Sequence, residues 1–487
     1  MLKKIRIVLA VVMAVGVTLL FLDVSGARHG WLGWMAKIQL LPAVLALNVG
    51  VIVGVVAVTL LLGRVYCSVV CPLGVMQDLF AWIGGKIRKN RYRYHKVVEW
   101  LRWTVLGVTV VCGVVGLNVV VGLLAPYSAY GRIVTSLGQP VWIWINNWMA
   151  GIAERHESYA IYSVETRAVV WSTMAVAVAT LMVVAGLSLW RGRLWCNSVC
   201  PVGTVLGLLS RWSLMKPVID KEKCVECGGC GKKCKAECID TANQRIDASR
   251  CVGCMNCMSD CKVGAIKYRA TWGKKAKKES AVDGGRRKFL VTTAAVGTAV
   301  ALKAEEANID GGLAKIEEKV STKRNTPLKP AGAKGVKIFG KRCTGCQLCV
   351  SECPQRILLP STKLETLMQP EMSYRDGYCR VECVRCSEVC PTGAIERLTV
   401  EEKSAISIGH AVVVRENCLS ARGEKCGHCA EVCPAGAVLM VEEAGSAYKV
   451  PAVDDERCIG CGKCEYLCPS RPLSAIYVEC REVHREV

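Results

Sequence analysis

Two neighbouring cysteine strings decide the fold of this chain, Cys224-Val-Glu-Cys227-Gly-Gly-Cys230-Gly-Lys-Lys-Cys234 and Cys251-Val-Gly-Cys254-Met-Asn-Cys257-Met-Ser-Asp-Cys261. Both have the spacing C-x2-C-x2-C-x3-C. In that spacing three thiolates on one tight loop bind three irons of a [4Fe-4S] cubane, and the fourth cysteine binds the partner cluster. The sequence therefore predicts one cluster held by Cys224, Cys227, Cys230 and Cys261, and a second held by Cys251, Cys254, Cys257 and Cys234.

Four further quartets follow toward the C-terminus, and two of them have a lengthened first gap. A zinc ribbon is disfavoured throughout, because it needs two CxxC pairs per ion and leaves the third cysteine of each loop idle. We expect six [4Fe-4S] clusters in all. The additional predicted ligands are Cys343, Cys346, Cys349 and Cys353; Cys379, Cys383, Cys386 and Cys390; Cys418, Cys426, Cys429 and Cys433; and Cys458, Cys461, Cys464 and Cys468.

The apolar part of the chain lies in its first half. Of 487 residues, 52% are hydrophobic, which is too many for an ordinary soluble protein. Hydropathy predicts four membrane spans of about 20 residues or more, near Ile5 to Val24, Leu40 to Gly63, Val97 to Ala125 and Ala168 to Trp190. We therefore expect a multi-domain protein: a four-helix transmembrane bundle with α+β ferredoxin-like iron-sulfur domains.

Basic residues predict how the spans are oriented. The net charge is +22, and the excess lies in the half that contains the spans. Lys and Arg crowd the N-terminus and the loop between spans two and three, which the positive-inside rule assigns to the cytoplasm. Membrane orientation explains this charge better than a nucleic-acid partner does, since no interleaved aromatic and basic patch is present. We expect a bacterial inner-membrane protein that contacts lipid and no nucleic acid.

An internal repeat follows the second and fourth spans. Gly63-Arg64-Val65-Tyr66-Cys67-Ser-Val-Val-Cys71-Pro72-Leu73-Gly74 recurs as Gly192-Arg193-Leu194-Trp195-Cys196-Asn-Ser-Val-Cys200-Pro201-Val202-Gly203. Both CxxxCP copies are expected at the cytoplasmic boundary. Their four thiols are candidates for a shared metal or cluster, for a dithiol switch, or for plain packing where a span breaks at proline. Outside the quartets and this repeat, Cys112, Cys238 and Cys480 remain, and Cys238 is a candidate spare ligand.

A second targeting signal is predicted in mid-chain. Arg286-Arg287-Lys-Phe289-Leu290 precedes a short, weakly apolar stretch, as in twin-arginine signals that export folded, cofactor-loaded domains. A basic linker with a buried helix is the alternative. The expected domains are a membrane domain over 1–215, a cytoplasmic two-cluster ferredoxin over 216–270, a linker with the signal over 271–303, a tether over 304–340, and a periplasmic four-cluster domain over 341–487.

Quinone chemistry needs a polar, proton-exchanging group near a bilayer surface. Asp23 and His29 on the outer side, and His95 and Glu99 on the inner side, are weak candidates, since solvated residues are commoner at such places. No CxxCH haem motif and no dinucleotide fingerprint occurs in the sequence. Quinol or menaquinol is therefore the expected electron donor.

With these motifs, the chain resembles a fusion of two membrane-bound nitrate-respiration subunits. Residues 1–270 are similar to NapH, with four spans, two CxxxCP motifs and a two-cluster ferredoxin. Residues 284–487 are similar to NapG, with a twin-arginine signal and four clusters. The resemblance implies quinol oxidation and electron transfer to a periplasmic cytochrome or reductase. The C-terminal quartets also resemble four-cluster subunits of respiratory oxidoreductases, which implies that motif one exchanges its last cysteine with motif four, and motif two with motif three.

Two other functions remain open at this point. Copper reductases of the CcoG type and maturation proteins of the NosR type combine related spans, CxxxCP motifs and ferredoxin quartets, so metal reduction or assembly is one alternative. The other is an electron-entry subunit of a larger membrane redox complex.

Overall fold

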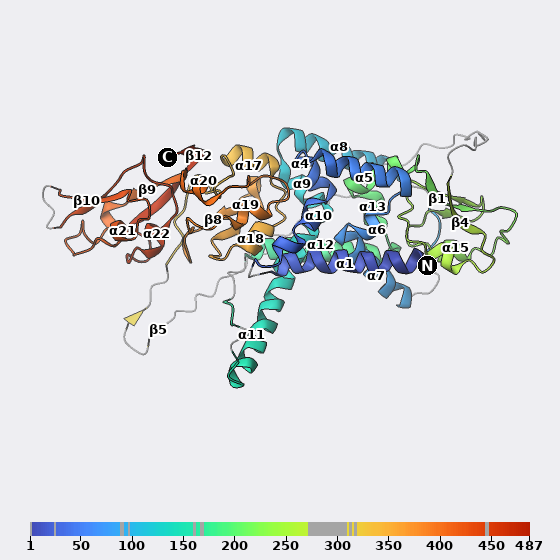
Figure 1. Cartoon of the computed structure of the whole chain (residues 1–487), viewed down its shortest axis with the longest axis horizontal. Helices are drawn as coiled ribbons and strands as arrows, with labels where there is room; N and C mark the ends of the chain where they lie inside the picture. The colour runs from blue at the N-terminus through green and yellow to red at the C-terminus, as the bar shows by residue number, and fades with distance from the viewer. Residues whose placement is uncertain are drawn as a thin grey trace, which may run out of the picture.

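The computed structural model describes residues 2–23, 26–87, 92–95, 98–158, 162–165, 170–270, 309–310, 314–315, 319–443 and 448–487. A helical body lies in the middle, with a small ferredoxin domain at one end and a larger cysteine-rich module at the other (Figure 1). The N-terminal end of helix α1 (Leu2–Leu22) lies at the ferredoxin end. The twin-arginine motif at Arg286 and Arg287 lies outside the described residues.

Two of the four expected spans form continuous helices long enough to cross a membrane. These are α1 and α12 (Trp171–Arg191), each of 21 residues and about 30 Å long. In the most apolar 18 residues of each helix, less than a third of the residues are buried inside the protein. Helices of this length and composition are consistent with membrane association. Residues 168 and 169 lie outside the described residues.

The prediction of a four-helix transmembrane bundle is wrong for the other two segments. Residues 40–63 divide into α4 (Leu40–Leu45) and α5 (Val49–Leu62), because Leu47 adopts φ 54° and Asn48 caps a new helix through Val51 N–H. Residues 97–125 divide into α8 (Glu99–Val115) and α9 (Asn118–Leu124) at Gly116, whose φ of 91° ends α8. A left-handed residue ends a helix because its carbonyl no longer points along the helix axis.

Short helices complete the helical body. α2 (His29–Leu32) and α3 (Trp34–Lys37) follow α1, and the segment after α9 continues through a helix that starts at a proline, Pro126, and a π-helical turn. The remaining bounds are α10 (Pro126–Ile133), η1 (Val134–Gly138) and α11 (Gln139–Arg155).

The sequence repeat is also a structural repeat. Gly63 ends α5 at φ 69° and Gly192 ends α12 at φ 67°, a backbone conformation that favours glycine. A short helix carrying the first cysteine follows in each copy, and the proline after the second cysteine then starts a longer helix. These helices are α6 (Tyr66–Val69) and α7 (Pro72–Ile87) in the first copy, and α13 (Leu194–Ser198) and α14 (Pro201–Ser210) in the second.

The ferredoxin domain has two small antiparallel sheets. β1 (Met215–Ile219) pairs with β4 (Ile266–Ala270), and β2 (Ile239–Asp240) pairs with β3 (Arg245–Ile246). The cysteine loops end in the one-turn helices α15 (Gly229–Lys232) and α16 (Asn256–Asp260). Leu214 N–H donates to the Leu60 carbonyl at 2.7 Å, which joins this domain to the end of α5.

The C-terminal module has two consecutive parts. The first part contains α17 (Val336–Arg342), α18 (Leu348–Glu352), β7 (Leu358–Pro360), η2 (Leu364–Thr366), β8 (Pro370–Met372) and α19 (Arg385–Val389). The second contains α20 (Val400–Ser404), β9 (Ile406–Val413), η3 (Arg415–Asn417), α21 (His428–Glu431), β10 (Val438–Val441), β11 (Val450–Val453), α22 (Lys463–Leu467) and β12 (Ile476–Glu486). β9 pairs with β12, and β10 pairs with β11.

Part of the expected tether is packed. Residues 319–340 lie against the C-terminal module, with Leu328 fully buried and Arg324 ion-paired to Glu465 at 2.5 Å. This segment carries enough apolar surface to be ordered, although its composition is rich in Lys and Pro. Between residues 271 and 318 the structure describes only β5 (Ile309–Asp310) and β6 (Ala314–Lys315).

Candidate metal and redox centres

Each cysteine of the ferredoxin domain lies with the partners that its spacing predicts. Cys224, Cys227, Cys230 and Cys261 line one cavity. A second cavity is lined by Cys251, Cys254, Cys257 and Cys234, together with Cys238. These cavities are cages of thiols on short loops, which is what a cubane needs.

The regular quartets share one backbone pattern. In each C-x2-C-x2-C loop, the residue before the second cysteine and the residue after it have positive φ, for example Gly253 at 63° and Met255 at 60°. The same pair of left-handed positions occurs in the loops that begin at Cys224, Cys343 and Cys458. This reversal of the backbone turns all three thiols inward, and it explains why glycine is frequent in these loops.

The four C-terminal quartets exchange cysteines in a different way from the expected one. Cys390 lies with Cys343, Cys346 and Cys349. Cys353 lines a cavity with Cys379, Cys383 and Cys386. Motif one therefore exchanges with motif two, and the predicted exchange between motifs one and four is wrong.

The other two motifs exchange with each other in the same manner. Cys468 shares a cavity with Cys418, Cys426 and Cys429. Cys433 lies with Cys458, Cys461 and Cys464. The predicted long-range exchange does not occur because each pair of consecutive motifs folds as its own two-site unit, so the nearest fourth cysteine comes from the neighbouring motif.

Cys238 is a fifth thiol in the second ferredoxin cage. Its Sγ lies 3.5 Å from that of Cys234, and it also interacts with Cys251. Cys238 is buried, with 2% of its surface exposed. It lies where the spare-ligand hypothesis would require, and its ligand role stays a prediction.

The two CxxxCP motifs meet in space. Cys67, Cys71, Cys196 and Cys200 are all buried and close enough to interact electrostatically, and we call them the four-thiol centre. Burial raises the pKa of the Cys71 thiol, and the neighbouring thiols Cys196 and Cys67 raise it further. Four thiols from two distant segments thus share one site, and whether they bind a metal stays a prediction.

Two fully buried arginines cross between the repeats. Arg64, from the first copy, donates to the Cys196 carbonyl at 3.1 Å and to Asn197 Oδ1 at 2.8 Å. Arg193, from the second copy, donates to the Cys67 carbonyl at 2.8 Å and lies 3.8 Å from Cys196 Sγ. The arginines therefore hold the two halves of the centre together and place positive charge beside its sulfurs.

A buried carboxylate balances part of this charge. Asp78 Oδ1 accepts from Arg193 Nε at 2.6 Å, while Oδ2 lies 2.9 Å from Arg6 and 2.6 Å from Lys235 Nζ. Burial raises the pKa of Asp78, but the ion pairs with Arg193 and Lys235 outweigh it and hold the pKa well below its ordinary value. Asp78 is therefore an ionised anchor between α1, the four-thiol centre and the ferredoxin domain.

The ferredoxin domain docks directly on the four-thiol centre. Arg64 donates to the Ser249 carbonyl at 2.9 Å, and Asn197 Nδ2 donates to the Ala236 carbonyl at 3.2 Å. Arg193 N–H donates to the carbonyl of Lys235 at 2.9 Å. Because Lys235 and Ala236 directly follow Cys234, the second ferredoxin cage and the four-thiol centre are adjacent.

The C-terminal module docks at the opposite end of the helical body. Ser128 Oγ donates to Thr344 Oγ1 at 2.9 Å, and Asn118 donates to the Gly340 carbonyl at 3.0 Å. A Cβ at Gly122 would overlap the Thr344 carbonyl. The loop between Cys343 and Cys346 therefore packs directly against the backbone of α9 at this glycine.

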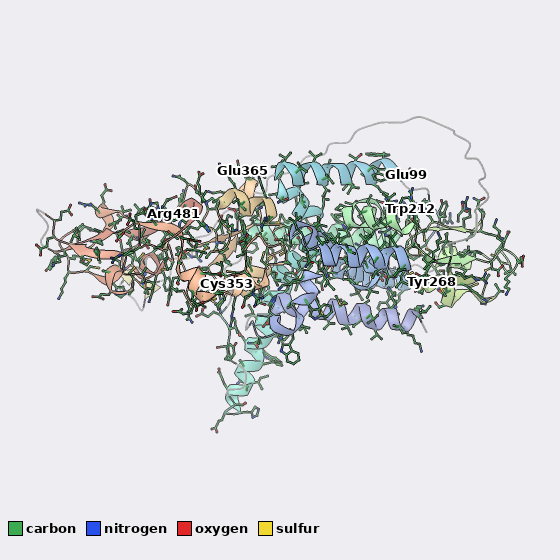
Figure 2. All side chains as sticks on the ribbon, turned by 45° about the horizontal axis from the view of Figure 1, so that its top comes forward. Glu99, Trp212, Tyr268, Cys353, Glu365 and Arg481 are labelled. Atoms are coloured by element: carbon green, nitrogen blue, oxygen red, sulfur yellow. The ribbon has the colours of Figure 1, made fainter. Side chains whose placement is uncertain are left out.

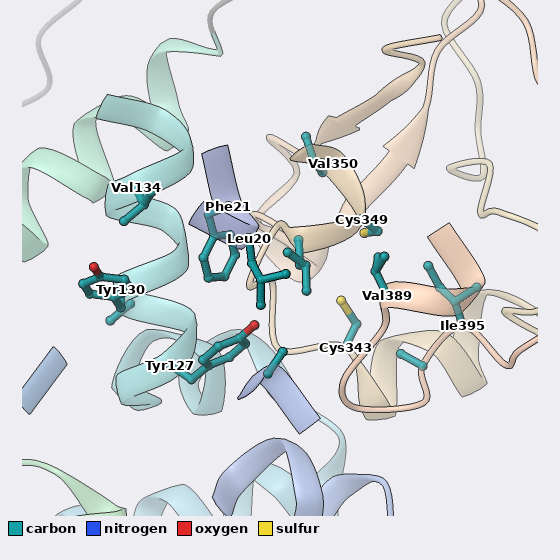
Figure 3. Close-up of a cluster of buried hydrophobic side chains, with 14 of the residues drawn as sticks. Leu20, Phe21, Tyr127, Tyr130, Val134, Cys343, Cys349, Val350, Val389 and Ile395 are labelled. Carbon is teal, nitrogen blue, oxygen red and sulfur yellow. The ribbon is translucent and has the colours of Figure 1, made fainter. Parts of the chain in front are cut away.

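Aromatic side chains fill this junction. Figure 3 shows the Tyr127 ring between α10 and the loop that carries Cys343, next to Leu20 and Phe21 of α1. The Phe21 and Tyr127 ring centroids are 5.6 Å apart. One buried cluster of side chains runs without interruption from Cys67, Cys71 and Cys200 through this junction to Cys343 and Cys349. The helical core therefore connects the four-thiol centre with the first cage of the C-terminal module.

Two of the four predicted quinone residues, His29 and His95, contact a docked iron-sulfur module. Asp23 is buried and accepts from Arg28 N–H at 2.7 Å, and His29 lies beside Glu388 of α19. His95 lies 3.4 Å from Glu237 of the ferredoxin domain. Glu99 is exposed, 3.9 Å from Arg211, and lies near Trp212 at the end of the body away from Cys353 (Figure 2). None of the four lines the large cavity described below.

Three family models match the chain. A 4Fe-4S binding domain matches residues 44–90 and 173–219, which hold the CxxxCP motifs, and another 4Fe-4S binding domain matches residues 245–267. A 4Fe-4S dicluster domain matches residues 342–394 and 422–471. Residues 342–394 hold motifs one and two, and residues 422–471 hold motif four and all of motif three except Cys418, so each segment corresponds to a pair of motifs that exchanges cysteines in the structure.

Curated proteins are similar to parts of the chain. The ferredoxin-type protein NapG of Escherichia coli (strain K12) is 34% identical over 202 residues, which cover 38% of this chain and 81% of NapG. The chain belongs to the NapG family of 4Fe-4S ferredoxin-type proteins. The methylamine utilization ferredoxin-type protein MauM of Methylobacillus flagellatus is 32% identical over 151 residues, covering 29% of this chain and 64% of MauM. The putative electron transport protein YccM of Escherichia coli is 25% identical over 222 residues, covering 44% and 55%.

Membership of the NapG family makes the chain an iron-sulfur electron-transport protein with multiple [4Fe-4S] clusters, and its cages fit that cofactor. Within the described ranges, no three His, Cys, Asp or Glu side chains lie close enough together to hold one metal ion directly. The sulfurs around a single zinc would be only about 3.8 Å apart, from a Zn–S distance near 2.3 Å. Loops that present three thiols to a fourth thiol from the partner motif suit a four-iron core.

Several residues of these sites were not predicted from the sequence of this NapG-family chain. Arg64 and Arg193 were visible as repeated letters beside the cysteines, and that repetition is the signal of their shared role. Asp78 and Tyr127 carried no signal, because single residues in apolar segments cannot be matched to their partners without the fold.

Proposed function

We propose that this chain is a NapH-like and NapG-like fusion that oxidises quinol in a bacterial inner membrane. In this proposal, six [4Fe-4S] clusters and the four-thiol centre carry electrons toward a periplasmic cytochrome or reductase. The ferredoxin domain is cytoplasmic and the C-terminal module periplasmic. The clusters would supply one-electron transfer when bound.

The observation that carries this proposal is the position of the four-thiol centre. It touches the second ferredoxin cage on one side through Arg64, Arg193 and Lys235. On the other side, the continuous buried cluster leads past Tyr127 to Cys343. A redox centre at Cys67, Cys71, Cys196 and Cys200 would therefore relay electrons between modules at opposite ends of the helical body.

The surface of the helical body supports a membrane location. Large apolar side chains are exposed along α1, α5, α8 and α12, for example Val12 at 53%, Val114 at 81% and Trp171 at 78%. Exposed apolar surface on this scale marks contact with lipid or another protein. The ends of the body, where both iron-sulfur modules dock, would then face opposite sides of the bilayer.

Purification under anaerobic conditions in native lipid tests the proposal. We expect about 24 irons per chain, from six four-iron sites, and reduction of the clusters by quinol in EPR spectra. Replacing Cys67 or Cys196 by serine should stop electron transfer between quinol and the C-terminal clusters while all six cages stay loaded. Cys112→Ser, in α8 and outside every cage, is the matched control. Transfer at the normal rate in the Cys67 and Cys196 variants would make these thiols structural.

The periplasmic location of the C-terminal module has its own test. Replacing both Arg286 and Arg287 by lysine should leave a cluster-loaded module in the cytoplasm, because twin-arginine recognition depends on the guanidinium pair. Protease protection in spheroplasts distinguishes the two locations. An unchanged protection pattern would show that the module reaches its compartment without this signal.

Copper reduction or metal assembly is the second candidate. The observation that favours it is the same group of four buried thiols, since soft thiolate ligands select Cu(I), although the thiols would have to move closer together to share one ion. Copper binding measured against a Cu(I) chelator decides between the two. Binding of one Cu(I) that the Cys67→Ser variant loses, with no reduction by quinol, would favour copper handling. An electron-entry role in a larger complex predicts instead that the clusters are reduced only with the partner subunits present.

A further inference from the structure

A large cavity opens beside the four-thiol centre, and nothing described so far uses it. Its volume is about 1400 Å³, and it lies between α1, α7, α10 with η1, and the ferredoxin domain. The other cavities described above are the small cysteine cages. This volume exceeds the 300–1,000 Å³ range typical of pockets that hold drug-sized ligands.

The two ends of the cavity differ in chemistry. Its walls are apolar side chains of α1 and α7, among them Ile7, Ala14, Val75 and Leu79, and its far end reaches Tyr130. The end at the ferredoxin domain is strongly basic, with only Asp78 and Asp260 as acidic residues. The basic residues are Lys3, Arg6, Lys86, Lys232, Lys233 and Lys235. The occupant that fits such a cavity has a long apolar part and a polar head that gains from positive charge.

The basic end also touches two redox sites. Asp78 lines the cavity and is bound by Arg193, whose guanidinium lies 3.8 Å from Cys196 Sγ. Lys235 lines the same wall and directly follows Cys234 in the chain. Asn256, also in the wall, lies between Cys254 and Cys257. A head group at this end would therefore be next to both the four-thiol centre and the second ferredoxin cage.

We propose that this cavity binds the quinol, with its isoprenoid tail between α1 and α7 and its ring at the basic end. The inference rests on the proposed function and gives that function a location. None of the four quinone-site candidates from the sequence, Asp23, His29, His95 and Glu99, lines this cavity. The proposed site is therefore distinct from them.

The geometry suits the chemistry of quinol oxidation. Both O–H bonds of the quinol break, and the two protons pass to water at the open basic mouth. The two electrons pass one at a time to oxidised [4Fe-4S] clusters, and a quinone is left. Positive charge from Arg6 and Lys235 stabilises the anion that forms after loss of the first proton. Asp78 positions these cations and is not itself the proton acceptor.

Photolabelling tests the binding site without reference to turnover. A short-chain azidoquinone, illuminated with the full chain in native lipid, should label peptides of α1 and α7, and excess unlabelled quinone should prevent the labelling. Ala14→Trp fills the cavity from α1 and should lower both the labelling and the rate of quinol-driven cluster reduction about tenfold, while reduction by dithionite is unchanged. Leu79→Trp, on α7, should act in the same way.

Val12→Trp is the matched control. Val12 is on the same helix, is 53% exposed and does not line the cavity, so its variant should behave as wild type. Suppose that quinol reduces the clusters of the wild-type chain. Labelling of other peptides, or normal reduction rates in both cavity variants, would then overturn this site and leave the proposed function standing. A phospholipid retained at these peptides and not displaced by quinone would overturn the site as well. A wild-type chain that quinol does not reduce would overturn both.

Discussion

The four-thiol centre and the cages of the C-terminal module are both groups of cysteines, but they are held in different ways. Each cage takes three thiols from one loop, and the fourth cysteine is at most 50 residues away in the chain. The four-thiol centre takes its thiols from segments about 130 residues apart, and the fully buried side chains of Arg64 and Arg193 join them. A cage therefore depends on local backbone conformation, whereas the four-thiol centre depends on the packing of the whole helical body.

Loss of a cage ligand should have the largest effect, because cluster binding is coupled to folding of the module. Cys390→Ser should remove about four irons per chain and the EPR signal of the cage with Cys343, Cys346 and Cys349. The cage of Cys353, Cys379, Cys383 and Cys386 should keep its signal. Cys468→Ser is the companion variant and should disturb only the cage of Cys418, Cys426 and Cys429. If the Cys468→Ser variant instead lost the cluster of the Cys343 cage, the result would support exchange between motifs one and four and contradict the arrangement described here.

Removing one of the crossing arginines should be the next largest effect. Arg193→Ala removes one of the cations that pair with the buried Asp78. It also removes the hydrogen bond that the Cys67 carbonyl accepts from Arg193. Breaking a buried ion pair in this way costs about 3–5 kcal/mol. Thermal unfolding in nanodiscs measures the loss. Arg211→Ala is the control, because its pair with Glu99 is exposed and contributes about 0–1 kcal/mol. Equal effects of the two variants would contradict the role given to Arg193.

A substitution at the junction tests whether the two regions work as one. Gly122→Ala places a methyl group against the Thr344 carbonyl, and overpacking of this kind costs about 1–3 kcal/mol. We expect faster hydrogen exchange around Thr344 and slower electron transfer to the C-terminal clusters, with all cages loaded. Gly151→Ala, on α11, meets no neighbouring atom and is the control. Normal transfer despite a loosened junction would mean that electrons reach the module by another route.

The smallest effect is expected at Cys238. Because the second ferredoxin cage has four other thiols, Cys238→Ser should leave the iron content unchanged. In the Cys234→Ala variant, Cys238 should take over as ligand, so the cluster should be lost only in the double variant. Iron counting and EPR of the three variants check this. Complete loss of the cluster in Cys234→Ala alone would show that Cys238 is too poorly placed to replace Cys234.

The same difference explains how far the sequence could predict this molecule. The cysteine spacing predicted the three thiols that each loop presents, and both complete cages of the ferredoxin domain, because spacing along a loop sets the local geometry. The exchange between motifs one and two could not be predicted, because it depends on how consecutive loops pack. Hydropathy predicted the apolar segments but not their breaks at Leu47 and Gly116, since a single left-handed residue ends a helix without changing its apolar character. Asp78 could be recognised only once Arg6, Arg193 and Lys235 were seen around it.

The crossing of the two arginines also constrains the order in which the chain can fold during synthesis. Arg64 is made about 130 residues before Asn197 and the Cys196 carbonyl, and about 185 residues before the Ser249 carbonyl that it also binds. Until those residues leave the ribosome, the guanidinium of the first repeat has none of these partners and must stay hydrated. The first half of the helical body should therefore wait in a loosely packed state. Final closure of the four-thiol centre, and with it any loading of that centre, should follow translation of the first ferredoxin domain.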